Sequence, residues 1–365
     1  MDNRFLNLAK PAYLSASLTR PDWTKDLTRS ESKLWLNKNE NPDPILNAKI
    51  KSLISEVKNF SINTYPETAK IYLKLAAMDN LAPSNFLLTH GSDGAIRAVF
   101  DVFIGPGDVV LHTNPTFAMY DVYSKMYGAR EVSFDYQYTD NGPQFDVERF
   151  FDFIKTQKPK LVCLPNPDSP TGTILSENKM HELLQLTKEL GSLLLIDEAY
   201  FPFYKTTVIK EINEFPNLLV CRSFSKAWGA AGFRVGYLAG HAGLIDLLHK
   251  SRPMYELSTF SSELINLLLD CQSDVLASVE RLEEGRLYFT KELEIMGFVV
   301  TKSYGNFLHV NFGSSENKIA DALKDIVLYR TEFSNASCLK GFSRFSLATK
   351  EQFEGIVQKI KSAIL

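Results

Sequence analysis

The sequence has few cysteines, no long apolar run and almost no net charge, and each shortage argues against a class of protein. Its four cysteines lie far apart without Cys-x-x-Cys spacing, which indicates reduced thiols in a protein core. No run of 18 apolar residues occurs, and the first ten residues lack the apolar segment of a leader peptide, so we expect a cytoplasmic protein with no membrane partner. The net charge of −3, with lysine and arginine scattered along the chain, argues against nucleic acid as a partner.

What the sequence does contain is an alternation of short apolar runs with helical periods. With 365 residues, 45% of them hydrophobic, the chain is long enough for one large domain and a smaller one. Continuously apolar strands that alternate with helices predict an α/β fold, with a mostly parallel sheet covered by helices on both faces. The strands are expected near residues 86–88, 109–112, 130–134, 161–164, 193–196, 218–221 and 235–239. Helices are expected near residues 69–78, 117–127, 147–157 and 177–190.

From about residue 255 this alternation ends. Two helical stretches are followed by shorter strands and a last amphipathic helix, which predicts a smaller α+β domain. Prolines punctuate residues 1–35 and favour an extended arm. We therefore expect an N-terminal arm with a small-domain segment (1–44), a large domain (45–255) and a small C-terminal domain (256–365).

Polar residues follow several of the predicted strands. Asp197 comes directly after the apolar run 193–196, and a proline-stiffened loop, 165–172, follows the run 161–164. Gly91-Ser92-Asp93-Gly94 lies at a strand-to-helix junction, where free backbone N–H groups can bind an anion. Ligands of parallel sheets bind beyond the carboxyl ends of the strands, so these segments are candidates for one site. Taken singly, Asp197 also fits a helix cap.

Residues 223–236 place a lysine among hydroxyls and small residues. Ser223 and Ser225 precede Lys226, and Arg234 follows eight residues later. A lysine that bonds covalently to a flat cofactor needs neighbours of little bulk, and two hydroxyls with a guanidinium suit a phosphate. Taken alone, the pattern is more typical of a surface lysine in a glycine-rich loop. The remaining motifs have to decide between the two interpretations.

Taken together, these motifs resemble the fold-type I aminotransferases that use pyridoxal phosphate, and most of all the histidinol-phosphate aminotransferase group. The resemblance covers most of the chain, from residue 39 to residue 344. Its blocks are Asn39-Glu40-Asn41-Pro42, Tyr65-Pro66, Gly91-Ser92-Asp93, Asn166-Pro167-x-x-Pro170-Thr171-Gly172, Asp197-Glu198-Ala199-Tyr200, Ser223-x-Ser225-Lys226, Gly232-x-Arg234-x-Gly236 and Arg344-x-Ser346.

The resemblance implies pyridoxal 5'-phosphate as the cofactor and assigns roles around it. Lys226 would form the Schiff base with the cofactor and carry the proton between the substrate Cα and the cofactor. Asp197 would bind the pyridine nitrogen, and Tyr200 would bind the ring's 3-oxygen. The resemblance also implies that Phe117 stacks on the face of the cofactor ring. The cofactor phosphate would be bound by Ser92, Asp93, Ser223, Ser225 and Arg234. No metal ligand is implied.

Three positions depart from the family pattern. Ser169 stands where an asparagine usually binds the 3-oxygen, so either water fills the gap or Tyr200 takes over more of that contact. Phe117 replaces a tyrosine, and Gly94 replaces a glutamate. None of the three removes a catalytic group, but each weakens an assignment to histidine biosynthesis.

The resemblance also places substrate residues. Asn39 belongs to the substrate side, Arg344 would bind the substrate carboxylate, and Arg330 and a tyrosine from the partner subunit, Tyr65, would bind a substrate phosphate. These roles imply a homodimer that transfers an amino group from a small-molecule donor, such as histidinol phosphate, to a 2-oxo acid such as 2-oxoglutarate in a ping-pong cycle. Three alternatives stay open: a decarboxylase or lyase of the threonine-phosphate decarboxylase type, an aminotransferase for aromatic or other amino acids, and a non-catalytic cofactor-binding protein.

Overall fold

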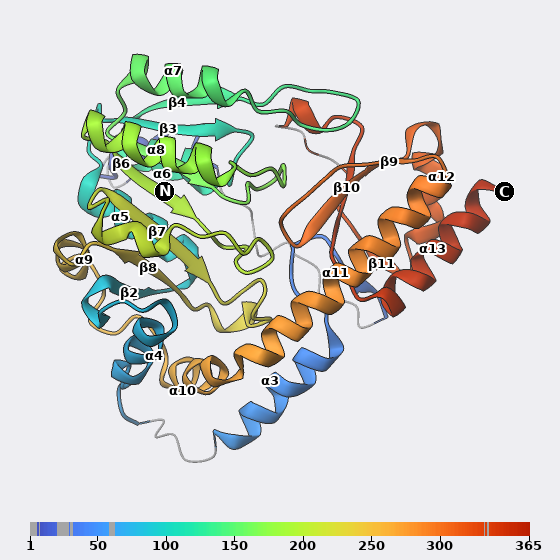
Figure 1. Ribbon diagram of the computed structural model, residues 1–365, viewed down its shortest axis with the longest axis horizontal. Coiled ribbons are helices and arrows are strands. Elements are labelled where there is room, and N and C mark those ends of the chain that lie inside the picture. The colour runs from blue at the N-terminus through green and yellow to red at the C-terminus, as the bar shows by residue number, and fades with distance from the viewer. Residues whose placement is uncertain are drawn as a thin grey trace.

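The computed structural model describes residues 6, 8–19, 29, 32–57, 63–331, 333 and 336–365. Within them, a large seven-stranded sheet and a smaller three-stranded sheet lie side by side, each with its own helices (Figure 1). No helix among the described residues is long and apolar enough to cross a membrane.

The large sheet has the strand order β2-β8-β7-β6-β5-β3-β4. Six strands run parallel, and β8 is antiparallel to both of its neighbours. The predicted strands are present, most of them a residue or two longer than the apolar run. Their bounds are β2 (Phe86–Thr89), β3 (Val109–Asn114), β4 (Arg130–Asp135), β5 (Leu161–Pro165), β6 (Leu193–Asp197), β7 (Leu218–Ser223) and β8 (Gly236–Gly240).

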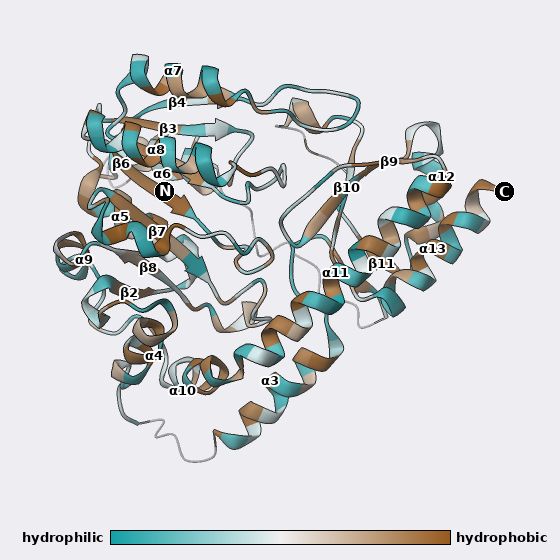
Figure 2. Cartoon of the chain, viewed as in Figure 1, coloured by the Kyte–Doolittle hydropathy of each residue, from teal (hydrophilic) through white to brown (hydrophobic). Residues whose placement is uncertain are grey.

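Helices cover both faces of this sheet because successive strand residues point to opposite sides. Leu194 and Ile196 of β6 pack in one apolar cluster, whereas Leu195 between them packs in the other. Figure 2 shows the central strands of the large sheet as mainly hydrophobic, whereas hydrophilic and hydrophobic residues alternate along α7 and α8. The helices that follow the strands are α5 (Gly91–Phe103), α6 (Met119–Tyr127), α7 (Val147–Gln157), α8 (Glu177–Leu190) and α9 (Ala242–His249).

The smaller unit is built from the C-terminal third of the chain and one N-terminal segment. Its antiparallel sheet has the order β12-β10-β9, and β1 pairs in parallel with β11 beside it. Its strands are β1 (Leu34–Trp35), β9 (Val299–Val300), β10 (Phe307–Asn311), β11 (Val327–Leu328) and β12 (Ser343–Ser346), and its helices are α12 (Glu316–Leu323) and α13 (Lys350–Ile364).

The long helix α11 (Gln272–Ile295) connects the two units, as Figure 1 shows. Val275 and Val279 in its first half pack with the core of the large sheet, whereas Leu282 and Phe289 pack with the small sheet. Helix α10 (Thr259–Leu268) also packs with the large sheet. The predicted division near residue 256 stays a prediction, and we propose moving it into α11.

The N-terminal region contains two helices that the sequence prediction did not include. A short helix, α2 (Pro11–Leu14), lies in the part expected to be extended, and residues 1–5, 7, 20–28, 30 and 31 of that arm lie outside the described residues. Helix α3 (Pro44–Glu56) follows Asp43, whose carboxylate accepts hydrogen bonds from the N–H groups of Ile45 and Leu46. Helix α4 (Ala69–Asp79) begins where it was predicted.

Candidate active site

A cavity of about 450 Å³ opens at the carboxyl ends of β5, β6 and β7, between the two units. The structure brings together in its wall every predicted site residue except Tyr65. These residues are Asn39, Ser92, Asp93, Phe117, Ser169, Asp197, Tyr200, Ser223, Ser225, Lys226, Arg234, Arg330 and Arg344. Among the described residues, no group of histidine, cysteine, aspartate or glutamate side chains could hold a metal ion.

Lys226 lies just beyond the end of β7, with its ammonium group in the cavity wall. Its Nζ donates a hydrogen bond to the carbonyl oxygen of Lys38 at 3.1 Å. Burial, together with the nearby charge of Arg344, lowers the pKa of Lys226 to about 8. Because a neutral amine is the nucleophile, this lysine is far better prepared to attack a carbonyl near neutral pH than a surface lysine would be.

Asp197 is the last residue of β6 and is 5% exposed. Its Oδ1 accepts a hydrogen bond from the Ala199 N–H at 2.9 Å, and its Oδ2 accepts one from the Tyr120 hydroxyl at 3.3 Å. Burial raises the pKa of Asp197 to about 6. A buried carboxylate of this kind favours a positively charged partner, such as a protonated ring nitrogen.

The hydroxyl of Tyr200 lies between Asn39 and Ser169. The Asn39 side-chain amide donates to this hydroxyl at 2.9 Å, and the hydroxyl donates to Ser169 Oγ at 3.2 Å. Ser169 is therefore in direct contact with Tyr200. The two alternatives for the ring's 3-oxygen, a bridging water or a larger role for Tyr200, stay predictions. Asn39, predicted to lie on the substrate side, contacts Tyr200 through its side-chain amide.

Asn39 has the left-handed backbone φ of 54°, and contacts from the small unit fix it there. Its N–H donates to Ser346 Oγ at 2.8 Å, and its carbonyl oxygen accepts a hydrogen bond from the Asn306 side chain at 2.9 Å. Asn306 is fully buried. The sequence prediction did not single out Asn306 or Tyr120, because each lies inside an apolar stretch that reads as core.

The other end of the cavity is a tightly packed group of backbone and hydroxyls at the start of α5. A Cβ at position 236 would lie 2.5 Å from the Gly91 carbonyl carbon and 2.7 Å from the Ser92 nitrogen. Gly91 has φ of +70°, and Arg234 Nη1 donates to Ser225 Oγ at 3.2 Å. Exposed N–H groups at a helix N-terminus, hydroxyls and a guanidinium together form a site that suits a phosphate group.

Arg344 and Arg330 form the small-unit wall of the cavity. Their backbones exchange two hydrogen bonds, of 3.0 and 2.7 Å, so their side chains project to the same face. Arg344 Nη2 donates to the Asn37 carbonyl at 2.9 Å, and its Nε is buried without a hydrogen-bond partner. Burial lowers the pKa of Arg344 to about 10, and partial desolvation lowers the pKa of the more exposed Arg330. An entering anion would therefore offset the cost of burying the charge of Arg344.

Tyr65 lies away from the cavity of its own chain. Its side chain is 69% exposed and stacks on Tyr255, with 4.0 Å between ring centroids. The role predicted for Tyr65 depends on a second subunit and stays a prediction.

Comparison with known proteins agrees with this geometry. Residues 31–360 match the family model described as "Aminotransferase class I and II". A histidinol-phosphate aminotransferase from Thermoanaerobacter sp. (strain X514) is 33% identical over 90% of this chain and 93% of that relative. A Sinorhizobium meliloti histidinol-phosphate aminotransferase, solved in complex with pyridoxal-5'-phosphate, superposes with a TM-score of 0.75 at 22% identity, over 91% of this chain and 90% of that one.

The same fold occurs in an L-threonine-O-3-phosphate decarboxylase from Porphyromonas gingivalis, with a TM-score of 0.73 at 18% identity over 91% of this chain and 99% of that one.

The chain belongs to the aminotransferase class I and II family and, within it, to the histidinol-phosphate aminotransferase group. It is a transaminase whose cofactor is pyridoxal 5'-phosphate. Three features of the site fit this cofactor: the closely packed glycines at 91 and 236, the buried carboxylate of Asp197 and the low pKa of Lys226.

Proposed function

We propose that this transaminase moves an amino group between a phosphorylated amino compound, such as histidinol phosphate, and a 2-oxo acid such as 2-oxoglutarate. The observation that carries the proposal is a pair of arginines on one wall of the cavity that also holds Lys226: Arg344, which is buried, and Arg330, which is exposed. A ping-pong enzyme binds two chemically different substrates in one cavity. Two forked cations suit both a phosphate and the two carboxylates of a dicarboxylic 2-oxo acid.

The roles proposed for the chain's own groups follow from their positions. Lys226 Nζ would hold the cofactor and would be the base that takes the proton from the substrate Cα. Asp197 would keep the ring nitrogen protonated, and Tyr200, supported by Asn39 and Ser169, would donate a hydrogen bond to the ring's 3-oxygen. The backbone of Ser92 and Asp93, together with Ser223, Ser225 and Arg234, anchors the phosphate, and Phe117 packs on the ring. The bound cofactor supplies the aldehyde that accepts the amino group and a ring that withdraws electrons from the Cα.

We expect Arg330→Ala to weaken the use of histidinol phosphate by roughly 10- to 100-fold in kcat/KM, because losing a charge-assisted hydrogen bond costs ~1.5–3 kcal/mol. The loss should be mainly in KM, because the arginine binds a group remote from the reacting carbon. Steady-state kinetics with histidinol phosphate and with unphosphorylated histidinol measure it. Arg330→Lys is the matched variant, which keeps the charge and loses the fork.

If Arg330→Ala left the KM for histidinol phosphate unchanged, the phosphate role of Arg330 would be wrong. If it weakened histidinol and histidinol phosphate equally, Arg330 would act on some other part of the substrate. Activity with aromatic amino acids in place of phosphorylated donors would support the alternative of an aromatic aminotransferase.

A decarboxylase is the second candidate, because the Porphyromonas gingivalis decarboxylase shares this fold. The two reactions differ in which bond at the Cα breaks. Assay of released CO₂ with a carboxylated amino substrate separates them: CO₂ in amounts equal to the substrate consumed would favour the decarboxylase.

We also propose that the enzyme is a homodimer in which Tyr65 reaches the cavity of the partner subunit. The support is that Tyr65 and Met254 are strongly exposed apolar groups near each other in the fold, next to the stacked Tyr255. Large exposed apolar groups that gather on one face are typical of interfaces. The location of the enzyme in the cytoplasm remains a prediction.

Mixing two inactive variants tests this shared site. In a heterodimer of Tyr65→Ala and Lys226→Ala subunits, one site has an intact Lys226 and receives an intact Tyr65 from the other subunit. We therefore expect mixed and re-equilibrated variants to regain activity that neither has alone, measured after subunit exchange. Activity of the mixture equal to the sum of the two separate variants would mean that Tyr65 does not serve the partner's site.

A further inference from the structure

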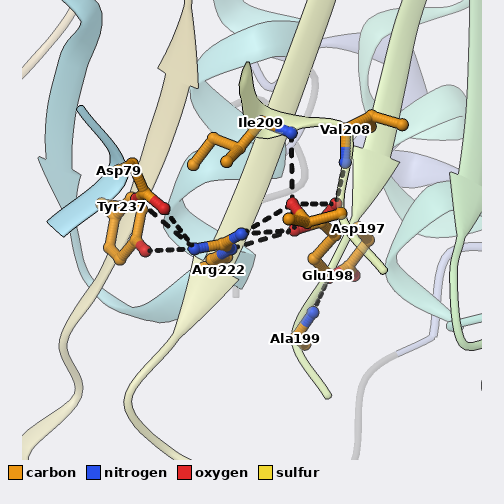
Figure 3. A network of polar contacts seen from close by, with 9 residues as sticks. Asp79, Asp197, Glu198, Ala199, Val208, Ile209, Arg222 and Tyr237 are labelled. Carbon is orange, nitrogen blue, oxygen red and sulfur yellow. Dashed lines mark hydrogen bonds and ion pairs between the residues drawn. The ribbon is translucent and has the colours of Figure 1, made fainter. Parts of the chain in front are cut away.

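Beneath the cavity lies a buried polar network centred on Arg222 of β7 (Figure 3). Arg222 is 3% exposed and uses all of its nitrogens. Its Nε donates to Glu198 Oε2 at 2.9 Å, its Nη1 donates to Asp79 Oδ1 at 3.2 Å and to the Tyr237 hydroxyl at 3.3 Å, and its Nη2 donates to Thr207 Oγ1 at 2.7 Å.

Glu198, one of the two acidic partners, has further hydrogen bonds of its own. Glu198 Oε1 also accepts a hydrogen bond from the Val208 N–H at 3.0 Å, and Thr207 Oγ1 lies 2.7 Å from Glu198 Oε2. The guanidinium carbon of Arg222 lies 3.8 Å from the centre of the Phe201 ring. Arg222 therefore links β6, β7, β8 and the end of α4 in one group.

Three residues of this network, two in strands and one just after β6, are each the sequence neighbour of a residue at or beside the cofactor end of the cavity. Glu198 follows Asp197, Arg222 precedes Ser223, and Tyr237 follows Gly236. Neighbouring residues on a strand point to opposite faces, so the network lies on one side of the three strand ends and the site on the other. The pairing registers Arg222 with Tyr237 and Ser223 with Gly236.

None of Asp79, Glu198, Arg222 and Tyr237 lines the cavity. Burying one guanidinium and two carboxylates contributes little to folding compared with apolar residues of the same size, whereas the geometry of such a group is highly specific. The main effect of the network is therefore to fix the positions of the strand ends. A cofactor site built from three strand ends needs their relative positions fixed to a fraction of an ångström.

We propose that Arg222 is a positioning residue for the cofactor site. By binding Glu198, Asp79 and Tyr237 together, it fixes the strand ends that carry Asp197, Ser223 and Gly236, and so sets the affinity of the protein for pyridoxal phosphate. The inference rests on the cofactor contacts proposed above for Asp197 and Ser223.

Two variants and a matched control test this inference. Arg222→Lys keeps the charge but cannot reach all four partners, and Tyr237→Phe removes only one hydroxyl from the network. Asn217→Ala is the control, because the Asn217 side chain donates to the Ser192 carbonyl at 2.8 Å and so joins the start of β7 to the start of β6, at the ends remote from the cavity. Cofactor-free protein is titrated with pyridoxal phosphate, the visible absorption band is recorded across pH, and the melting temperature is measured without cofactor.

We expect Arg222→Lys to weaken cofactor binding about ten-fold or more and Tyr237→Phe to weaken it about three-fold, with a shifted pH dependence of the visible band. Asn217→Ala should lower the melting temperature and leave both readings unchanged. If Arg222→Lys does not fold, cofactor affinity and the pH dependence of the visible band of Tyr237→Phe test the inference. Cofactor affinity and spectra equal to those of the unaltered protein, with only the melting temperature lowered, would overturn the inference. Failure of the unaltered protein to bind pyridoxal phosphate would instead contradict the cofactor assignment itself.

Discussion

Lys226→Ala is expected to lower the transamination rate by about 10⁴-fold or more and to abolish the visible absorption band of the cofactor-loaded protein. The reason is that one side chain supplies both the covalent bond to the cofactor and the proton transfer at the substrate Cα. The lowered pKa of Lys226, about 8, shows that its surroundings favour the neutral amine needed for both tasks. Absorption spectroscopy and single-turnover kinetics measure the two losses separately.

The matched control for this variant is Lys38→Ala. Lys38 also lines the cavity, but its contact with Lys226 Nζ is made by the backbone carbonyl, which alanine retains. We expect Lys38→Ala to keep the visible band. A Lys226→Ala protein that kept the band and the unaltered turnover would show that another group holds the cofactor.

Asp197→Asn is expected to lower kcat by about 10²–10³-fold while the cofactor stays covalently bound. An amide cannot form an ion pair with a protonated ring nitrogen, so the electron-withdrawing form of the ring is lost, and losses of this size are typical when one preorganised electrostatic contact is removed. Loading is measured from the visible band and kcat from steady-state kinetics.

Asp168 offers the control for this second variant. It too is a buried aspartate, 1% exposed, with its pKa raised to about 7 by burial, but it accepts hydrogen bonds from Thr171 and Thr113 and does not line the cavity. Asp168→Asn should lower stability and leave kcat within a few-fold. Equal losses of kcat in the two variants would remove the special role of Asp197.

Local sequence patterns predicted much of the fold because they depend on neighbours in the chain. The periodic apolar residues of α7 and α8 gave their bounds to the residue, and the apolar runs located the strands of the large sheet. Helix α3 was missed although its start has a known signal, Asp43 as the cap followed by Pro44 in the first turn. The turn-favouring residues just before Asp43 were interpreted as a loop instead.

The contacts that the sequence could not predict join residues far apart in the chain. Arg222 and Asp79 are 143 positions apart, and each is a single charge beside apolar residues, so no spacing rule connects them. Likewise, the contact of Ser169 with Tyr200 and the support of Asn39 by Asn306 depend on how the two units meet. The candidate site residues were predicted from the family resemblance, and the structure places all of them except Tyr65 around one cavity, while their individual roles stay predictions.

The most direct test of the account mixes cofactor-loaded enzyme with histidinol phosphate in the absence of any 2-oxo acid and follows the visible band. We expect one equivalent of the band to disappear and to return when 2-oxoglutarate is added, because the amino group taken from the donor is passed to the 2-oxo acid in the second half-reaction. A band that histidinol phosphate leaves unchanged, or one that does not return when 2-oxoglutarate is added, would contradict the proposed transamination of a phosphorylated substrate.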